Sequence, residues 1–151
     1  MASNHPKAVK MAAALCLRFE GLYLKPYICP AGVPTIGVGC TEYPDGRKVQ
    51  MTDPPITKDT ALVMLYERLM REDLRNVLRC VPNVDTHGRA AALASFNFNL
   101  GSSALRGSTL RRKAQSGDWE SAKAEFMRWT KAGGRVLKGL VLRRQAEAAL
   151  L

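Results

Sequence analysis

Three side chains in the first quarter of the chain have types and a spacing suited to chemistry on a sugar bond. Eight residues separate Glu20 from Cys29, and five separate Cys29 from Thr35. Cleaving a glycosidic bond requires an acid that protonates the leaving oxygen and a second group, usually Asp, on the other face of the sugar. A glutamate in a partly dry site suits the acid's role. A glutamate at a helix end is usually only solvated, so this interpretation depends on the surroundings of Glu20.

The elements predicted around these residues allow all three to face one cleft. Apolar residues at helical spacing predict a helix over residues 7–19, which Gly21 ends, so that Glu20 lies at the mouth of the helix. Residues 22–56 mix strand formers with Pro and Gly, which predicts a small sheet of about three strands with tight turns. Cys29 and Thr35 then lie on successive turns of that sheet.

The remaining sequence is predicted to be helical. Thr57 caps a long helix over about 58–80, and shorter helices follow over about 86–100, 108–116, 118–127 and 139 to the end. The prediction is an α+β protein with a small three-stranded β lobe over about 20–56, a linking helix over about 57–80 and a larger helical lobe over about 82–151, with the 7–19 helix packed on it. A cleft between the lobes is the default place for a ligand.

The charge of the chain predicts a polyanionic partner. The net charge is +10, and residues 81–151 carry 12 basic and five acidic side chains. Such a field attracts nucleic acid, anionic lipid or the anionic bacterial cell wall, and charge alone does not choose among them. The sequence shows no helix-turn-helix, aromatic RNA-binding motif or zinc finger, so a basic nucleic-acid binder is the weaker alternative.

The cysteines and histidines do not predict a metal site. Cys16, Cys29, Cys40 and Cys80 form no C-x-x-C pair, and both histidines are far from them in sequence. No metal or cofactor is expected. The even number of cysteines allows disulfides outside the cytoplasm, but the pairing cannot be read from the sequence. The apolar stretch 11–17 is much shorter than the ~20 residues of a membrane span, so no stable membrane anchor is expected.

Several motifs, in order along the chain, resemble the phage lysozyme (endolysin) family of glycoside hydrolases. The family's signature is Glu, eight residues, Asp or Cys, five residues, Thr, which Glu20, Cys29 and Thr35 match. The similar segments, which together cover about 15–150, are residues 18–21 (RFEG), 34–39 (PTIGVG), 96–101 (FNFNLG), 108–110 (STL), 128–134 (RWTKAGG) and 139–147 (GLVLRRQAE).

The resemblance implies hydrolysis of the β-1,4 bond between N-acetylmuramic acid and N-acetylglucosamine in bacterial peptidoglycan. Glu20 matches the general acid, Thr35 the residue that places water or contacts substrate, and Cys29 the second catalytic position. Arg143 falls near the arginine that pairs with the catalytic glutamate, and Arg144 is the alternative.

The same resemblance suggests substrate-binding residues and a biological setting. Phe98, Asn99 and Arg143 are the candidates to bind substrate. We expect a monomer that waits in the host cytoplasm, depends on a separate holin for release, and acts in the periplasm on the cell wall at the end of a phage cycle. The partner is then peptidoglycan, with no nucleic acid involved.

Two positions depart from the commoner family pattern. Cys29 stands where many members have Asp, and Cys40 stands where many have His. A thiol carries charge only if its pKa is lowered toward neutrality, so Cys29 is a thiolate, a weak base or only a contact for water. Some relatives with a membrane-anchored N-terminus are controlled by thiol exchange, and a disulfide from Cys29 to Cys40 or Cys16 would silence this site.

The Cys29 departure also keeps a second enzyme class open. A lytic transglycosylase uses one Glu as acid and base, and it forms a 1,6-anhydro product without water. Thr35, at its family spacing, favours hydrolysis. A degenerate lysozyme kept as a wall-binding module is a further alternative, and it requires Glu20 to be dispensable.

Overall fold

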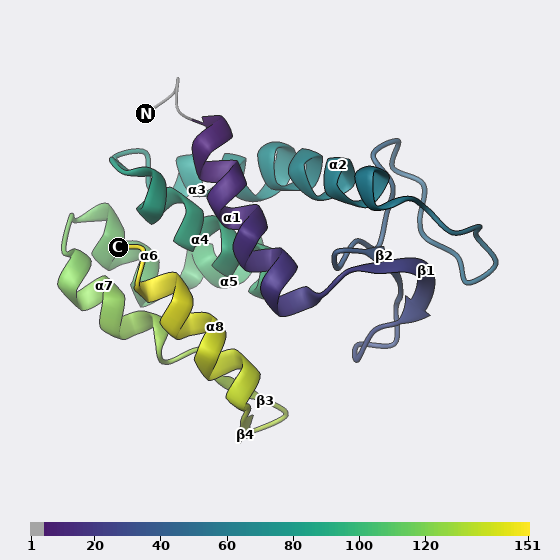
Figure 1. Ribbon diagram of the computed structural model, residues 1–151. Coiled ribbons are helices and arrows are strands. Elements are labelled where there is room, and N and C mark those ends of the chain that lie inside the picture. Colours follow the sequence, from purple (N-terminus) through teal and green to yellow (C-terminus); the bar gives the residue numbers. More distant parts are fainter. Residues whose placement is uncertain (1–4) are drawn as a thin grey trace.

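A long helix of three segments joins a small β-containing lobe to a larger helical lobe in the computed structural model, which describes residues 5–151 (Figure 1). Its segments are α2 (Lys58–Arg68), the π-helical turn η2 (Leu69–Asp73) and α3 (Leu74–Cys80). The Thr57 side chain accepts a hydrogen bond from the Thr60 backbone N–H at 3.1 Å, as a helix cap does. The predicted linking helix is confirmed, and the π turn in its middle was not predicted.

The β lobe has fewer strands than the sequence predicted. Strands β1 (Tyr23–Ile28) and β2 (Pro34–Gly37) pair antiparallel, with Tyr27 opposite Thr35. Within residues 5–151, the rest of this lobe contributes only two isolated bridges, Ile36 to Cys40 and Glu42 to Lys48. The prediction of three strands is therefore wrong. The reason is that glycines with positive φ at 37, 39 and 46 turn the chain before a third strand can extend.

The helical lobe is built around one central helix, α4 (His87–Leu100). Nine consecutive residues of α4, Ala90 to Phe98, are buried. The first helix, α1 (His5–Glu20), packs along α4, and α8 (Lys138–Ala148) packs beside both (Figure 1). The lobe is completed by α5 (Ser102–Gly107), α6 (Thr109–Gln115), α7 (Trp119–Phe126) and a hairpin of β3 (Lys131–Ala132) and β4 (Arg135–Val136).

Local capping explains why several predicted boundaries hold. The side chains of Thr86, Ser108 and Asp118 each accept a hydrogen bond from the backbone N–H three residues later, at the starts of α4, α6 and α7. The short helix α5, which lies between two predicted helices, was not predicted, and at the β3–β4 hairpin the sequence indicated only a break at Gly133 and Gly134.

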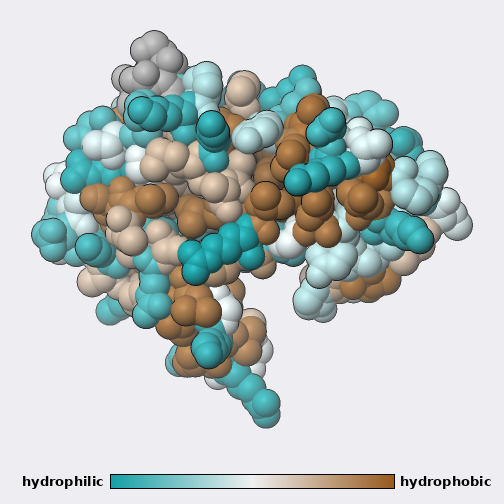
Figure 2. Space-filling model, in the orientation of Figure 1, coloured by the Kyte–Doolittle hydropathy of each residue, from teal (hydrophilic) through white to brown (hydrophobic). Residues whose placement is uncertain are grey.

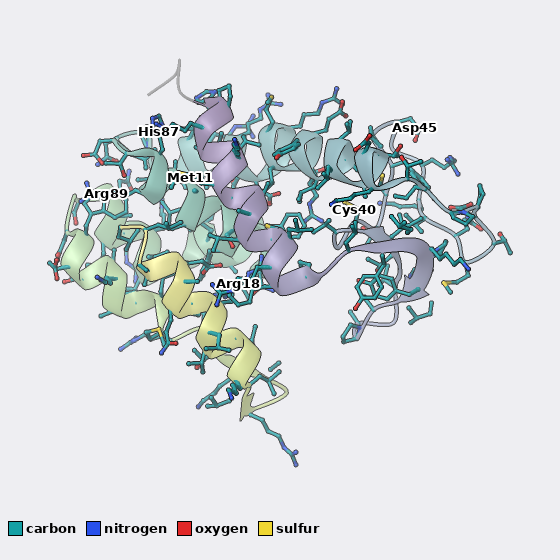
Figure 3. The ribbon with its side chains drawn as sticks, in the orientation of Figure 1. Met11, Arg18, Cys40, Asp45, His87 and Arg89 are labelled. Atoms are coloured by element: carbon teal, nitrogen blue, oxygen red, sulfur yellow. The ribbon has the colours of Figure 1, made fainter. Side chains whose placement is uncertain are left out.

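The two lobes border a notch in the molecular outline. Figure 2 shows it between the β lobe and the projecting tip of α8 with the β3–β4 hairpin. The base of the β lobe is closed by a small apolar cluster of Ile36, Cys40, Val49 and Met64. Cys40 accordingly lies between α2 and the β1–β2 sheet (Figure 3). No helix among residues 5–151 is long and apolar enough to cross a membrane.

Candidate active site

Glu20 is the last residue of α1, where the helix reaches the β lobe. Its side chain is 25% exposed, and its Oε1 accepts a hydrogen bond from Nη1 of Arg143 at 2.6 Å. Arg143 lies on α8 and is 2% exposed, although 123 residues separate it from Glu20 in the sequence. The structure therefore places Arg143, and not Arg144, against Glu20. A guanidinium this deeply buried contacts the glutamate rather than a ligand in the cleft.

Buried side chains hold Arg143 in turn. Its Nη2 donates to the Oγ of Ser95 at 3.3 Å and its Nε to Oε1 of Glu147 at 3.4 Å. Ser95 also donates from Oγ to Oε1 of Glu147 at 2.7 Å. Burial raises the pKa of Glu147, while the neighbouring Arg144 and Arg143 charges lower it. The Glu20 carboxylate is thus the exposed end of a buried network of Arg143, Ser95 and Glu147.

Asn99 and Arg144 form the far end of this network. The Nη2 of Arg144 donates to Oε1 of Glu147 at 2.9 Å and to Oδ1 of Asn99 at 2.8 Å. Burial lowers the pKa of Arg144, and the charge of Glu147 opposes that shift. The side-chain oxygen of Asn99, a candidate for binding substrate, is thus already engaged by a buried charge.

The second oxygen of Glu20 lies beside Gly39 and Phe98, which we call the flanking residues. A Cβ placed on Gly39 would come within 3.0 Å of Glu20 Oε2 and 3.3 Å of Phe98 Cε1. Gly39 also has a φ of +65°, which L side chains rarely adopt. Glycine is required here for both reasons, and Phe98, 7% exposed, closes the same space from the helical lobe.

Cys29 lies in the tight turn between β1 and β2. Its backbone N–H donates to the Val33 carbonyl at 3.0 Å, and its own carbonyl accepts from Gly32 at 2.8 Å. A hydrogen bond from the Val33 backbone N–H lowers the pKa of the Cys29 thiol. This thiol is partly exposed, so it combines access with a stabilised charged form.

Thr35 joins Cys29 to the sheet. Its hydroxyl donates to the Val33 carbonyl at 2.8 Å, and the residue is 2% exposed. Tyr27 lies opposite Thr35 in the sheet. Its pKa responds to the charge of Glu20. Burial raises the pKa of Tyr27 most, and the charges of Glu20, Tyr23, Cys29 and Cys40 raise it further. Tyr27 is therefore within electrostatic range of both candidate catalytic groups.

The other three thiols are buried and all four cysteines are free. Burial raises the pKa of Cys16 to about 12 and that of Cys40 to about 11. Cys16 accepts a hydrogen bond from Arg143 Nη2 at 3.6 Å, and Cys40 donates to the Val38 carbonyl at 3.7 Å. The two pairings weighed for Cys29, with Cys40 or Cys16, are not formed in this structure.

Sequence reasoning missed four residues of the site: Tyr27, Gly39, Ser95 and Glu147. Gly39 carried a usable signal, since it falls within the 34–39 motif. Glu147 ends the 139–147 motif, but the motif does not say that its side chain turns inward. Ser95 and Tyr27 had no local signal. Among residues 5–151, no group of three or more His, Cys, Asp or Glu side chains is placed to hold a metal ion.

Comparison with known proteins gives the family. The phage lysozyme family matches residues 17–147. The endolysin of Acyrthosiphon pisum secondary endosymbiont phage 1 is 40% identical over 144 residues, covering 90% of this chain and 91% of that protein. The endolysin of Salmonella phage P22 is 36% identical over 135 residues, covering 88% of this chain and 89% of that protein.

Solved structures agree with that assignment. The endolysin from Escherichia coli O157:H7 phage FAHEc1 superposes with a TM-score of 0.83 at 28% identity, covering 93% of this chain and 90% of that one. A variant of P22 lysozyme superposes with a TM-score of 0.78 at 33% identity, covering 92% and 93%. Fold and sequence together show that the chain belongs to the phage lysozyme family, the muramidases with which phages lyse the host cell wall.

Proposed function

We propose that this endolysin hydrolyses the β-1,4 bond between N-acetylmuramic acid and N-acetylglucosamine, with Glu20 as the acid. The observation that carries the proposal is the asymmetry of the Glu20 carboxylate. Oε1 is tied to buried Arg143 at 2.6 Å, whereas Oε2 lies beside Gly39 and Phe98. A carboxyl group held by one oxygen presents the other in a fixed direction, which favours proton delivery to a bound sugar.

Cys29 and Thr35 supply the second side of the reaction in this proposal. Water that contacts Thr35 and Cys29 attacks the anomeric carbon and releases one proton to solvent, the bond from that carbon to the glycosidic oxygen breaks, and the oxygen takes its proton from Glu20. The lowered pKa of Cys29 makes the thiolate easier to form there than in an ordinary cysteine, in the position where Asp is usual. A negative charge there stabilises the oxocarbenium-like transition state.

Purified Gram-negative peptidoglycan tests the reaction directly. It is digested with the wild type, with Glu20→Gln, and with Glu120→Gln as a control at an exposed glutamate on α7. The released muropeptides are weighed by mass spectrometry, with and without reductant. We expect N-acetylmuramic acid at the reducing ends for the wild type and for Glu120→Gln, and none for Glu20→Gln.

Two outcomes contradict the proposal. Products that are lighter by one water carry a 1,6-anhydro end and identify a lytic transglycosylase. Equal cleavage by Glu20→Gln removes Glu20 from the acid's role. A requirement for reductant adds a thiol switch to the same reaction. Action as a monomer, dependence on a separate holin and residence in the host cytoplasm until lysis stay predictions from the sequence.

A further inference from the structure

We propose that Arg68 is a positioning residue that sets the spacing of Gly39 and Phe98 beside the Glu20 carboxylate. Arg68 is the last residue of α2 and contacts both lobes. Its Nη1 donates to the Gly39 carbonyl at 3.4 Å, and its Nη2 donates to the Phe98 carbonyl at 3.5 Å. One planar guanidinium thus joins the two residues that flank Glu20 Oε2. The inference rests on the proposed function of Glu20.

Arg68 holds Phe98 in two ways at once. Its guanidinium carbon lies 4.0 Å from the centre of the Phe98 ring, in cation–π contact. The Phe98 carbonyl belongs to the last turn of α4, where carbonyl groups lack partners within the helix and favour a positive charge. Ring and backbone are therefore fixed by the same side chain, which restricts how far Phe98 moves from Gly39.

The π turn supplies the anchor for Arg68 itself. In a regular α-helix, residues five apart lie about 140° apart around the axis and do not meet. The π-helical turn Leu69–Asp73 has a wider repeat, and Asp73 Oδ2 accordingly lies 3.5 Å from Arg68 Nε. These two atoms are buried and have no hydrogen-bond partner among residues 5–151, so their charges compensate each other.

Asp73 is itself held by a hydrogen bond to the helical lobe. It is 2% exposed, and its Oδ1 accepts a hydrogen bond from Asn97 Nδ2 at 2.7 Å. Asn97 precedes Phe98 on α4 and also accepts from Asn76 Nδ2 at 2.7 Å. Asp73 thus orients the guanidinium of Arg68 through Nε, while Nη1 and Nη2 contact Gly39 and Phe98.

The close fit at Glu20 makes small shifts costly. The space between Gly39, Phe98 and Glu20 Oε2 does not admit even one added carbon without contacts of 3.0 and 3.3 Å. When Arg68 is lost, the flanking residues separate and the direction in which Oε2 faces the sugar is no longer fixed. Misplacement of a reacting group by about 1 Å lowers a rate by about 100-fold.

The test compares Arg68→Lys and Arg68→Met with Arg71→Met. Arg71 is the matched control because it lies on the same long helix, in η2, its side chain is 65% exposed, and its one ion pair among residues 5–151 is with Glu67 at 3.8 Å. Steady-state cleavage of solubilised glycan strands gives kcat and KM, and thermal unfolding gives Tm. Lysine keeps the charge opposite Asp73 but lacks the fork that reaches two carbonyls.

We expect Arg68→Met and Arg68→Lys to lower kcat by about 10- to 100-fold with KM changed by less than about threefold. Lysine should restore Tm without restoring kcat, which a merely structural role does not produce. In a double-mutant cycle, Phe98→Leu should add little to the loss in Arg68→Lys, because both changes release the same contact. Arg71→Met should match the wild type.

Three results overturn the inference. They are an unchanged kcat in Arg68→Lys with only Tm lowered, a rise in KM alone, and full additivity with Phe98→Leu. If Arg68→Met does not fold, the comparison of Arg68→Lys with Arg71→Met decides. A wild type that does not cleave glycan strands is a different failure, because it removes the proposed function rather than the role of Arg68.

Discussion

The two sides of the candidate site are held by different forces. On the helical side, Glu20 is tied to Arg143 and through it to Ser95 and Glu147, which are buried side chains on separate helices. On the β side, Cys29 is held in a surface turn by backbone hydrogen bonds with Val33 and Gly32. Glu20, the proposed acid, is therefore held by buried side chains that depend on one another. The second position rests on backbone geometry, which a different side chain at 29 leaves intact.

The largest effect is expected from the acid itself. Glu20→Gln should lower kcat by about 10²- to 10⁴-fold, because the amide keeps the shape but has no proton to give. Glutamine still accepts a hydrogen bond from Arg143, so the fold should persist. Circular dichroism checks the fold and muropeptide release checks the rate. A loss below tenfold would mean that the two sides of the site do not differ as described.

Removing the partner of the acid should damage both activity and stability. Arg143→Met leaves half-buried Glu20 without its cation and buried Glu147 with Arg144 alone, and breaking a buried pair costs about 3–5 kcal/mol of stability. Chemical denaturation measures that loss. The control is Arg128→Met, which removes a 74% exposed arginine side chain whose one ion pair in the described part of the chain is with Glu125. If both variants lose equal stability, the helical side has no special network.

The buried carboxyl group of Asp73 should make the free energy of unfolding depend on pH. Burial raises the pKa of Asp73 from its usual 3.8 to about 6, against the charge of Arg68 and the Asn97 hydrogen bond. The folded state therefore holds this proton longer than the unfolded state. The associated stability is fully present below pH 3.8 and is lost as the pH rises through 6, by about 2 kcal/mol between pH 4.5 and 7.

The matching measurement compares Asp73→Asn with the wild type at pH 4.5 and pH 7. The asparagine does not titrate, so the difference in unfolding free energy between the two pH values should shrink in Asp73→Asn. Glu120→Gln, an exposed exchange of the same kind, should keep the wild-type difference. A pH response of Asp73→Asn identical to that of the wild type contradicts the expectation.

The β side should tolerate substitution best. Cys29→Ala removes one contact to water and should lower kcat by about tenfold, the equivalent of one hydrogen bond in the transition state. Cys29→Asp should keep or raise the wild-type rate, because the turn is built by the backbone. A loss in Cys29→Ala as large as that in Glu20→Gln would place Cys29 on a par with the acid.

The smallest expected effect is a difference in reactivity between the Cys29 thiol on the β side and the buried thiols. Cys29 is partly exposed with a lowered pKa, whereas Cys16 and Cys40 are buried with raised pKa values. The folded protein at pH 7.5 should therefore take up iodoacetamide at Cys29 before the other two. Peptide mass mapping over time gives the order. Equal labelling at the three positions would show that the structure opens faster than Cys29 reacts.

The parts of the fold that local chemistry dictates could be predicted from the sequence. Thr57 and Asp118 each cap a helix within three residues of themselves, so the boundaries there needed no knowledge of the rest of the chain. Glu20 was predicted differently, because a helix-end glutamate is usually only solvated and its assignment rested on the spacing signature of the phage lysozyme family. In the proline- and glycine-rich segment after Gly37, the sequence predicted a third strand where the structure has isolated bridges. Isolated bridges and strands have the same residue preferences, so the sequence did not distinguish them.

The remaining features depend on contacts that no local pattern encodes. Ser95 meets Glu147 across 52 residues and Arg143 across 48. The π turn brings Arg68 and Asp73 together, and the helical periodicity of 58–80 shows no break there. Arg143 itself was proposed only through the family resemblance, and its choice over Arg144 required the geometry.

The 123-residue separation of Glu20 from Arg143 has a consequence for the order in which the protein is made. A ribosome adds about 5–20 residues per second, so Arg143 follows Glu20 by about 6 to 25 seconds. During that interval the nascent chain carries its acid without the cation that orients it. Catalytic competence is thus acquired late in translation, and prematurely terminated products lacking α8 are expected to be inert.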